Sequence, residues 1–298
     1  MNMLELSHVA KRFGEKQVLR DVTFSVPEHS VFGFVGKNGA GKTTAMKLIL
    51  GLLSSDSGEI SVNGSTVCYG TTKTNRFVGY LPDVPEFYPF MTPREYLRFC
   101  GEISGMKAGE IESRSEELLA LVGLEKDNRR LKGFSRGMKQ RLGIAQALLG
   151  RPKLLICDEP TSALDPAGRK DLLDILADAR EQTTVLFSTH ILSDVEHICD
   201  QIAFLHEGKI VLQGTLKEVR AKRKDAAVEL ELERPEDAPL LIRVFHDLKS
   251  KGRGRFLLED AGRLPELFRF LADSRISVLR IERREASIED LFMEVVGK

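Results

Sequence analysis

The chain has 298 residues, of which 42% are hydrophobic, so it exceeds one ordinary domain and can build a substantial core. Lysine plus arginine and aspartate plus glutamate number 44 each, and this balance gives no net positive field to attract nucleic acid. The four cysteines form no CxxC pair, which argues against a zinc site or a disulfide framework and fits a reducing cytoplasm. The N-terminus has no basic flank before an apolar stretch, and no window reaches the roughly 20 apolar residues that cross a bilayer. We therefore expect a chain that is soluble by itself.

The first elements are predicted to be strands. In residues 4–26 the apolar side chains tend to alternate with polar ones, which predicts an antiparallel sheet with one wet face. Residues 31–36 are continuously apolar, as in a strand buried on both faces, and a helix follows from Lys42. Asn63-Gly64 is a hairpin signal, and residues 77–82 form another short strand pattern.

A helical region is predicted from about residue 92 to residue 148. Thr92 can cap a helix, Pro93 suits its first position, and Glu95 completes a capping box. The strands on either side of this region belong to one core, so the helices are an insertion. The fold class is therefore α/β, with an antiparallel β subdomain and a helical insertion.

Two further apolar strands are predicted at residues 154–158 and 184–190, with a helix between them that Asp165-Pro166 begins. The composition changes in the basic segment 216–225, which predicts a domain boundary between residues 1–220 and a small α+β domain at residues 225–298. In this domain we expect strands at 228–232 and 256–258, helices near 240–249 and 264–271, and a last strand and helix.

The segment GKNGAGKT at residues 36–43 matches G-x-x-x-x-G-K-[ST] and lies between a buried strand and a helix. Glycines let successive N–H groups converge on phosphates, Lys42 supplies a point charge, and Thr43 offers its hydroxyl to magnesium. An ordinary glycine turn is the alternative, which the strand and helix context disfavours. The residues predicted to bind the nucleotide phosphates are Gly36, Asn38, Gly39, Ala40, Gly41, Lys42, Thr43 and Thr44.

Two carboxylates end the apolar strand LLICD, at the edge of the sheet where ligands bind in parallel sheets. We predict that Asp158 holds magnesium through water and that Glu159 polarises the attacking water as a general base. Two acidic residues after a strand are often only solvated turn formers, but a phosphate loop in the same chain favours the functional interpretation.

These motifs, in this order, resemble the ATP-binding cassette (ABC) ATPases over residues 3–213, a family whose fold is a P-loop NTPase core. The resemblance implies that Asp165, in the D-loop-like segment PTSALDP, lies where two subunits communicate. It puts His190 at the switch-histidine position and Phe13 where an aromatic ring stacks on adenine. Taken alone, His190 would more often be structural, and Phe13 would be a core residue.

The segment GFSRGMKQRLG at residues 133–143 is similar to the family's signature segment, which contacts the ATP bound to the other subunit. The resemblance assigns this contact to Ser135, Arg136, Gly137 and Met138. Physically, a serine hydroxyl and an unobstructed glycine N–H at the positive end of a helix favour an anion. A serine that only caps the helix would leave the close glycine turn unexplained.

The sequence departs from the common LSGGQ pattern, because Arg136 replaces a glycine and Met138 a glutamine. Asp83 occupies the Q-loop position, where the family usually has a glutamine near magnesium and the attacking water. An aspartate there accepts hydrogen bonds but adds a negative charge beside the phosphates, which argues against a direct metal role.

The resemblance implies the ATPase subunit of a membrane transporter, using ATP and Mg²⁺, on the inner face of the cell membrane. Its partners would be a separate transmembrane permease subunit and a second nucleotide-binding subunit, identical or different. The segments at residues 134–149 and 287–297 resemble the exporter branch. The alternatives are a soluble, non-transport ABC ATPase that acts on nucleic acid or the ribosome, and a small-molecule kinase. No nucleic acid is expected, because the charge is balanced.

The segment VPEFYPF at residues 84–90 carries three aromatic side chains in a predicted loop. Aromatic rings on a loop either fold inward or dock on a partner, because they are costly to leave in water. The resemblance implies that this loop receives a coupling helix of the membrane subunit, so we expect Phe87 and Tyr88 to dock.

Overall fold

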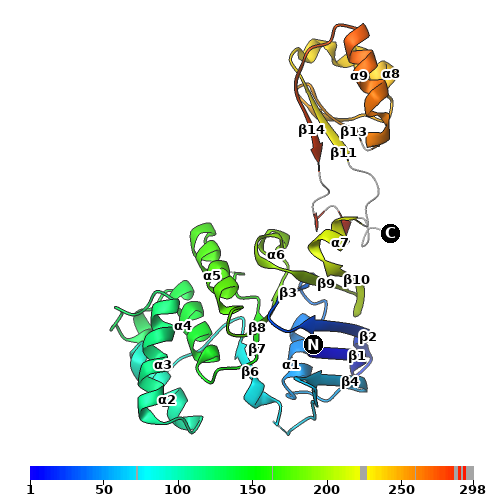
Figure 1. The fold of residues 1–298 in the computed structure, drawn as a ribbon. Coiled ribbons are helices and arrows are strands. Elements are labelled where there is room, and N and C mark those ends of the chain that lie inside the picture. The colour runs from blue at the N-terminus through cyan, green and yellow to red at the C-terminus, as the bar shows by residue number, and fades with distance from the viewer. Residues whose placement is uncertain are drawn as a thin grey trace. The chain divides into compact units, whose positions relative to one another are not determined.

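The computed structural model describes residues 1–71, 73–162, 164–221, 227–258, 260–284, 288–289 and 291–292. The chain divides into two compact units, Met1–Leu216 and Lys217–Lys298. Both are shown in Figure 1. Within the described ranges, no helix combines the length and apolar character needed to cross a membrane. The predicted boundary segment includes residues 222–225, which lie outside the described residues, so the limits of the two domains stay predictions.

The first unit is built around one sheet of ten strands among the described residues, in the order β5-β4-β1-β2-β10-β9-β3-β8-β7-β6. Its strands are β1 Asn2–Phe13, β2 Lys16–Pro27, β3 Val31–Val35, β4 Ser57–Val62, β5 Ser65–Thr66, β6 Val78–Leu81, β7 Leu154–Asp158, β8 Thr184–Thr189, β9 Gln201–His206 and β10 Lys209–Thr215. Neighbours β9, β3, β8, β7 and β6 run parallel, whereas β5, β4, β1 and β2 are antiparallel. The predicted α/β core with an antiparallel part is therefore confirmed.

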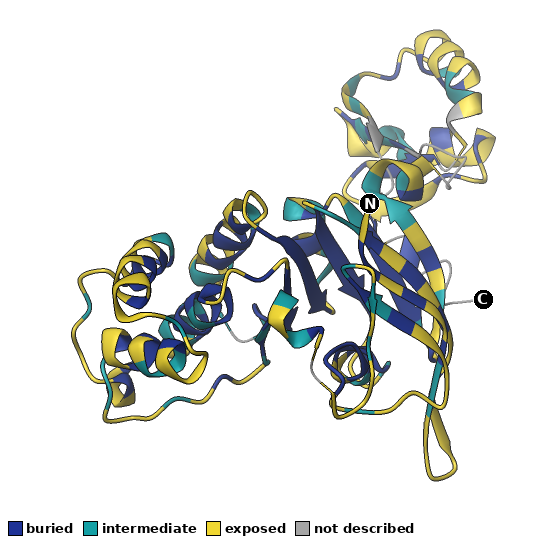
Figure 2. Cartoon of the chain, turned by 60° about the horizontal axis from the view of Figure 1, so that its bottom comes forward, coloured by how far each residue is buried: buried dark blue, intermediate teal, exposed yellow. Residues whose placement is uncertain are grey.

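Burial follows the sequence pattern. Every residue of β3, β7 and β8 is buried, as expected for parallel strands covered on both faces. β2 alternates buried and exposed residues from Val22 onward, as expected for one wet face. Figure 2 shows the buried central strands beside helices with exposed outer faces.

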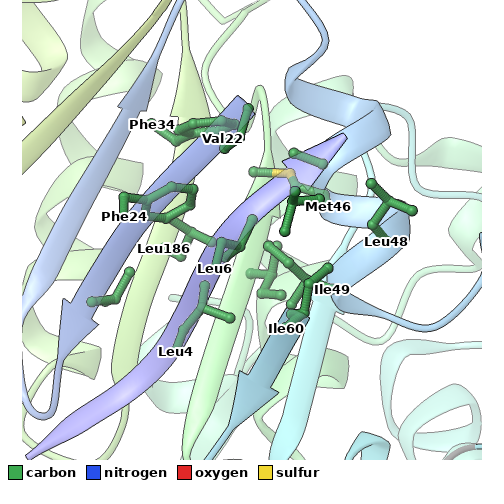
Figure 3. Close-up of a cluster of buried hydrophobic side chains, with 14 of the residues drawn as sticks. Leu4, Leu6, Val22, Phe24, Phe34, Met46, Leu48, Ile49, Ile60 and Leu186 are labelled. Atoms are coloured by element: carbon green, nitrogen blue, oxygen red, sulfur yellow. The ribbon is translucent and has the colours of Figure 1, made fainter. Parts of the chain in front are cut away.

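Helix α1, Lys42–Ile49, fills the space between the two parts of the sheet. Its side chains Met46 and Ile49 meet Leu6 of β1 in one buried cluster (Figure 3). Phe24 of β2 stacks on Phe34 of β3, with ring centroids 5.2 Å apart. This packing fixes the start of α1, and with it the phosphate loop, against the sheet.

The helical insertion is formed by α2 Pro93–Ile103, α3 Ala108–Leu121 and α4 Arg136–Leu148. The predicted capping box is present, since Thr92 Oγ1 accepts from Glu95 N–H and Glu95 Oε2 accepts from Thr92 N–H. Arg114 of α3 is fully buried and donates to the carbonyl of Leu148 at the end of α4, 3.2 Å away. Helices α5 Pro166–Ala179, α6 Leu192–Ile198 and α7 Leu216–Ala221 follow, and of these only α5 was predicted.

The second unit contains a four-stranded antiparallel sheet in the order β12-β13-β11-β14, together with α8 Ala238–Val244 and α9 Leu264–Asp273. The strands are β11 Ala227–Leu232, β12 Lys249–Gly252, β13 Arg255–Leu258 and β14 Val278–Arg284. The predicted helix near 240–249 was wrong at its end, because Lys249 begins β12. Gly252 and Gly254 have positive φ and turn this strand into β13 as a hairpin. The exporter-like segment at 287–297 lies largely outside the described residues.

Gly79 lets β6 lie directly against the end of α4. A Cβ atom on Gly79 would lie 2.1 Å from the backbone oxygen of Ala147, which cannot move without displacing the helix. We predict that Gly79→Ala lowers the free energy of unfolding by about 1–3 kcal/mol. The check is the denaturant midpoint in urea. Gly150→Ala is the control, because a Cβ there meets no atom within 4 Å, and an equal loss in both variants would contradict the prediction.

Candidate functional site

A cavity of about 790 Å³ opens where the loops after β3, β6, β7 and β8 meet. The carboxyl ends of these parallel strands share one edge of the sheet, which is where open α/β sheets bind ligands. The predicted residues that line the cavity are Phe13, Asn38, Gly39, Gly41, Lys42, Thr43, Thr44, Asp83, Glu159 and His190. The structure therefore brings together residues from four loops and from the end of β1.

The phosphate loop has the backbone that its glycines predict. Gly39 and Gly41 adopt positive φ angles of 81° and 111°, and a Cβ on Gly36 would lie 2.7 Å from the oxygen of Leu205. Gly41 caps α1 without a side-chain hydrogen bond, so the first N–H groups of the helix are available to an anion. The buried Lys42 Nζ donates to the carbonyl of Gly36, 2.5 Å away.

Thr43, Asp158 and Ser188 form a chain of hydrogen bonds. Thr43 Oγ1 donates to Asp158 Oδ2 at 2.8 Å, and Ser188 Oγ donates to Asp158 Oδ1 at 2.6 Å. A hydroxyl and a carboxylate at this separation are oxygen donors of the kind that Mg²⁺ prefers, and Mg²⁺ usually takes few protein ligands because it keeps its waters and the substrate phosphates. The residues present therefore fit the ion.

Glu159 lies between the imidazole of His190 and the ammonium of Lys42. Its Oε2 is 2.8 Å from His190 Nδ1, and its Oε1 is 3.0 Å from Lys42 Nζ in an ion pair. The same ammonium also donates to the carbonyls of Gly36 and Lys37, so Lys42 ties Glu159 to the phosphate loop. Glu159 also has a positive φ of 49°, a strained conformation of the kind found at functional sites, and its N–H donates to Ser188 Oγ.

Nearby groups that could titrate are held neutral by burial. Burial, aided by the charge of Asp158, raises the pKa of the Cys157 thiol well above its usual range. Burial also raises the pKa of Tyr80 to about 12, again with a contribution from Asp158. Cys157 is thus no thiolate nucleophile near neutral pH.

The signature-like residues do not line this cavity. Ser135 caps α4, with Oγ accepting from Met138 N–H at 3.3 Å, and Arg136 and Gly137 follow it in the first turn. Asp165 likewise caps α5, with Oδ1 accepting from Gly168 N–H at 3.0 Å. Ser135, Gly137 and Asp165 therefore do not line the cavity of their own chain, whereas Arg136 reaches Asp83, which does line it.

Comparison with known proteins identifies the family. The family model described as "ABC transporter" matches residues 19–162, and "ATP-binding protein DrrA1-3-like, C-terminal domain" matches residues 214–296. The "Uncharacterized ABC transporter ATP-binding protein YxlF" of Bacillus subtilis is 36% identical over 99% of both chains. This chain is an ABC transporter ATP-binding subunit. The "Bacitracin transport ATP-binding protein BcrA" of Bacillus licheniformis is 33% identical over 99% of this chain and 97% of that protein.

Solved structures agree with this identification. A structure described as "Structure of ATP binding subunit of ABC transporter" aligns with a TM-score of 0.67 and 36% identity, covering 74% of this chain and 92% of that one. The resemblance read from the motifs is thus confirmed, and so is the assignment as an ATPase of a transporter. The comparisons do not support the alternative of a non-transport ABC ATPase, because the full-length relatives are transporter subunits.

The cavity also contains residues that the sequence patterns did not predict. Lys16, Val18 and Ser162 line the cavity, and Ser188 holds Asp158 from the neighbouring strand. Ser188 stands in the strand segment TVLFSTH, where a serine among buried apolar residues was the available signal. Lys16 and Val18 follow Phe13 in the chain but belong to no binding motif, so the sequence does not indicate that they line the cavity.

We predict that Ser188→Ala lowers the ATPase turnover at least ~10-fold, because Asp158 and the N–H of Glu159 both lose the group that orients them. The free energy of unfolding should fall by about 1–3 kcal/mol, since buried polar atoms lose a partner. Thr189→Val is the control. It removes the neighbouring buried hydroxyl, which accepts only from the N–H of Ile191 among the described contacts. Equal turnover in the two variants would contradict an orienting role for Ser188.

Proposed function

We propose that this ABC ATPase powers an exporter from the inner face of the cell membrane. The support for export comes from relatives named for bacitracin transport, linearmycin resistance and lantibiotic transport. These compounds are antibiotics, so the proposed cargo is a molecule of this class. The observation that carries the ATPase mechanism is the cavity in which Lys42, the Thr43 and Asp158 pair, and Glu159 with His190 converge.

ATP would bind with its phosphates on the loop. The uncapped N–H groups of α1 and the ammonium of Lys42 favour a polyanion there. Phe13 is 46% exposed and lines the same cavity, and the Lys11 ammonium lies 5.5 Å from its ring centroid, so adenine would stack on the remaining ring face. The other predicted residues of the phosphate loop, from Gly36 to Thr44, would offer their backbone N–H groups to the same phosphates.

Magnesium would be held by Thr43 and Asp158, and when bound it neutralises charge on the phosphates. Glu159 would accept a proton from the attacking water, since it is a carboxylate at the end of β7 that lines the cavity. His190 would hold the other carboxylate oxygen, 2.8 Å from Nδ1, and so orient the base. The residues assigned to catalysis are therefore Glu159 and His190.

The signature residues and Asp165 would act on a second subunit. Ser135 and Gly137 do not line the cavity of their own chain, which leaves them available to the nucleotide of a facing copy. Two such contacts would close a head-to-tail dimer around two nucleotides. The second subunit is proposed to be another ATP-binding chain of this kind, identical or different.

A separate membrane-spanning subunit is the proposed partner of the segment 84–90. Phe87 is half-buried and packs on Tyr96, with ring centroids 4.9 Å apart, so the docking of Phe87 stays a prediction. Val84, Tyr88 and Phe90 remain 60%, 49% and 60% exposed. Three exposed apolar side chains within one loop beside the nucleotide cavity suit a contact that reports the nucleotide state.

We predict that Glu159→Gln keeps ATP affinity but slows turnover at least ~100-fold, as expected for the loss of a general base. ATP should then trap the dimer, which size-exclusion chromatography detects. Lys42→Ala is the control variant, because it should lose nucleotide binding and therefore form no ATP-dependent dimer. Phosphate release near the unmodified rate in Glu159→Gln would remove Glu159 from this role.

A second prediction tests the partner. Replacing Val84 and Phe90 together by serine should abolish copurification with the membrane subunit while the isolated chain still binds ATP, because both side chains are exposed. Leu52→Ser with Tyr69→Ser is the matched control, since these side chains are 56% and 66% exposed in another part of the unit. Retained assembly in the first variant, or equal loss in both, would refute docking on this segment.

A further inference from the structure

The two charged residues that depart from the family's pattern contact each other. Asp83, after β6, and Arg136, in the first turn of α4, are 53 positions apart, and Asp83 Oδ1 accepts from Arg136 Nη2 at 3.4 Å. The pair is half exposed, with side-chain exposures of 50% and 47%. Each residue alone would put an unusual charge into the site, but together they are neutral.

Asp83 is a junction between three segments. Its Oδ1 also accepts from Ser162 Oγ in the loop after β7, at 3.1 Å. Its backbone oxygen accepts from Gln140 Nε2 of α4 at 2.6 Å, and this glutamine is buried. Helix α4 is thus tied to Asp83 twice, through the main chain by Gln140 and through the carboxylate by Arg136.

The position of Arg136 is unfavourable for the helix itself. It is the first residue of α4, where the helix dipole favours negative charge, and the first turn contains no acidic residue. Helix formation therefore gives no reason for an arginine here. The nearby carboxylate of Asp83 supplies one.

The charge of Asp83 also needs an explanation. Asp83 lines the same cavity as Lys42 and Thr43, into which a nucleotide brings its polyanionic phosphates. The other acidic residue lining the cavity, Glu159, is paired with Lys42. Without Arg136, Asp83 would face the phosphates with an uncompensated negative charge, and like charges in a partly enclosed site repel.

We propose that Arg136 is a positioning residue for the nucleotide site of its own chain: it holds Asp83 against α4 and neutralises it, so that the phosphates can enter. This role is separate from any contact that the signature segment makes with a second subunit. It rests on the proposed ATP site, but it concerns the affinity of a single chain for nucleotide.

The test is a double-variant cycle on the full chain at concentrations where it is monomeric, with binding of a fluorescent ATP analogue as the readout. Arg136→Gln should raise the Kd about three- to fivefold at low salt, the size expected from one exposed ion pair. Asp83→Asn should bind no more weakly than the unmodified chain. In the double variant the Kd should return to within about twofold of the unmodified value. Salt at ~0.5 M should shrink the effect of Arg136→Gln, because screening acts on charge and not on packing.

The pair Arg141 and Asp171 is the matched control. Arg141 Nη2 donates from α4 to Asp171 Oδ2 of α5 at 2.7 Å, and neither residue lines the cavity. Arg141→Gln should leave the Kd unchanged. Lys42→Ala tests the ATP site itself, so retained binding in that variant would refute the proposed function and not the pair.

Two results would overturn the inference. If Arg136→Gln weakens binding equally in the presence and absence of the Asp83 carboxylate, Arg136 acts by itself and not through Asp83. If Arg136→Gln leaves the monomer Kd unchanged and lowers only ATP-dependent dimer formation, the arginine serves the second subunit's nucleotide.

Discussion

The hydrogen bonds from Thr43 and Ser188 to Asp158 are the interaction on which the rest of the site depends. Asp158 is 3% exposed, and a buried carboxylate is stable only where its oxygens are satisfied. Asp158 ends β7, and its two partners come from the start of α1, which follows β3, and from β8. The carboxylate therefore holds three neighbouring parts of the parallel sheet together at its carboxyl edge. Because β3, β7 and β8 are buried throughout, these loops cannot move apart without exposing the core.

This rigid frame explains how Glu159 keeps an unfavourable backbone. A non-glycine residue at a φ of 49° needs surrounding contacts that fix it. Its N–H donates to Ser188 Oγ, and its carboxylate lies between His190 and the buried ammonium of Lys42. Lys42 in turn requires a counter-charge, because it is only 6% exposed. The same contacts therefore hold the residue proposed as the base and balance the residue proposed to bind phosphate.

Much of this could be predicted from the sequence, because the chemistry of the phosphate loop is local. Glycine spacing, the apolar strand before it and the helix after it all lie within residues 31–49. The contacts of Ser188 and Arg136 could not be predicted, since they depend on strand order and on helix packing between distant segments. The end of α8 was misjudged for a different reason. The apolar spacing of residues 240–249 suits a helix, but the hairpin that begins at Lys249 pairs with β13 and overrides it.

Asp83 follows β6 and Arg136 begins α4, so the close contact between this strand and this helix also fixes the distance between the two charges. A Cβ atom on Gly79 would lie 2.1 Å from the backbone oxygen of Ala147, and one on Gly143 would lie 2.4 Å from the side chain of Leu81, so the helix and the strand are in direct contact. Packed interiors transmit displacement because they contain few voids. A shift of α4 therefore moves β6, and with it the residues that follow the strand. Those residues are Asp83, facing the nucleotide cavity, and the exposed apolar segment from Val84 to Phe90. The start of α4, the nucleotide cavity and the surface proposed for the membrane subunit are thus connected by direct contacts and by the chain segment after β6.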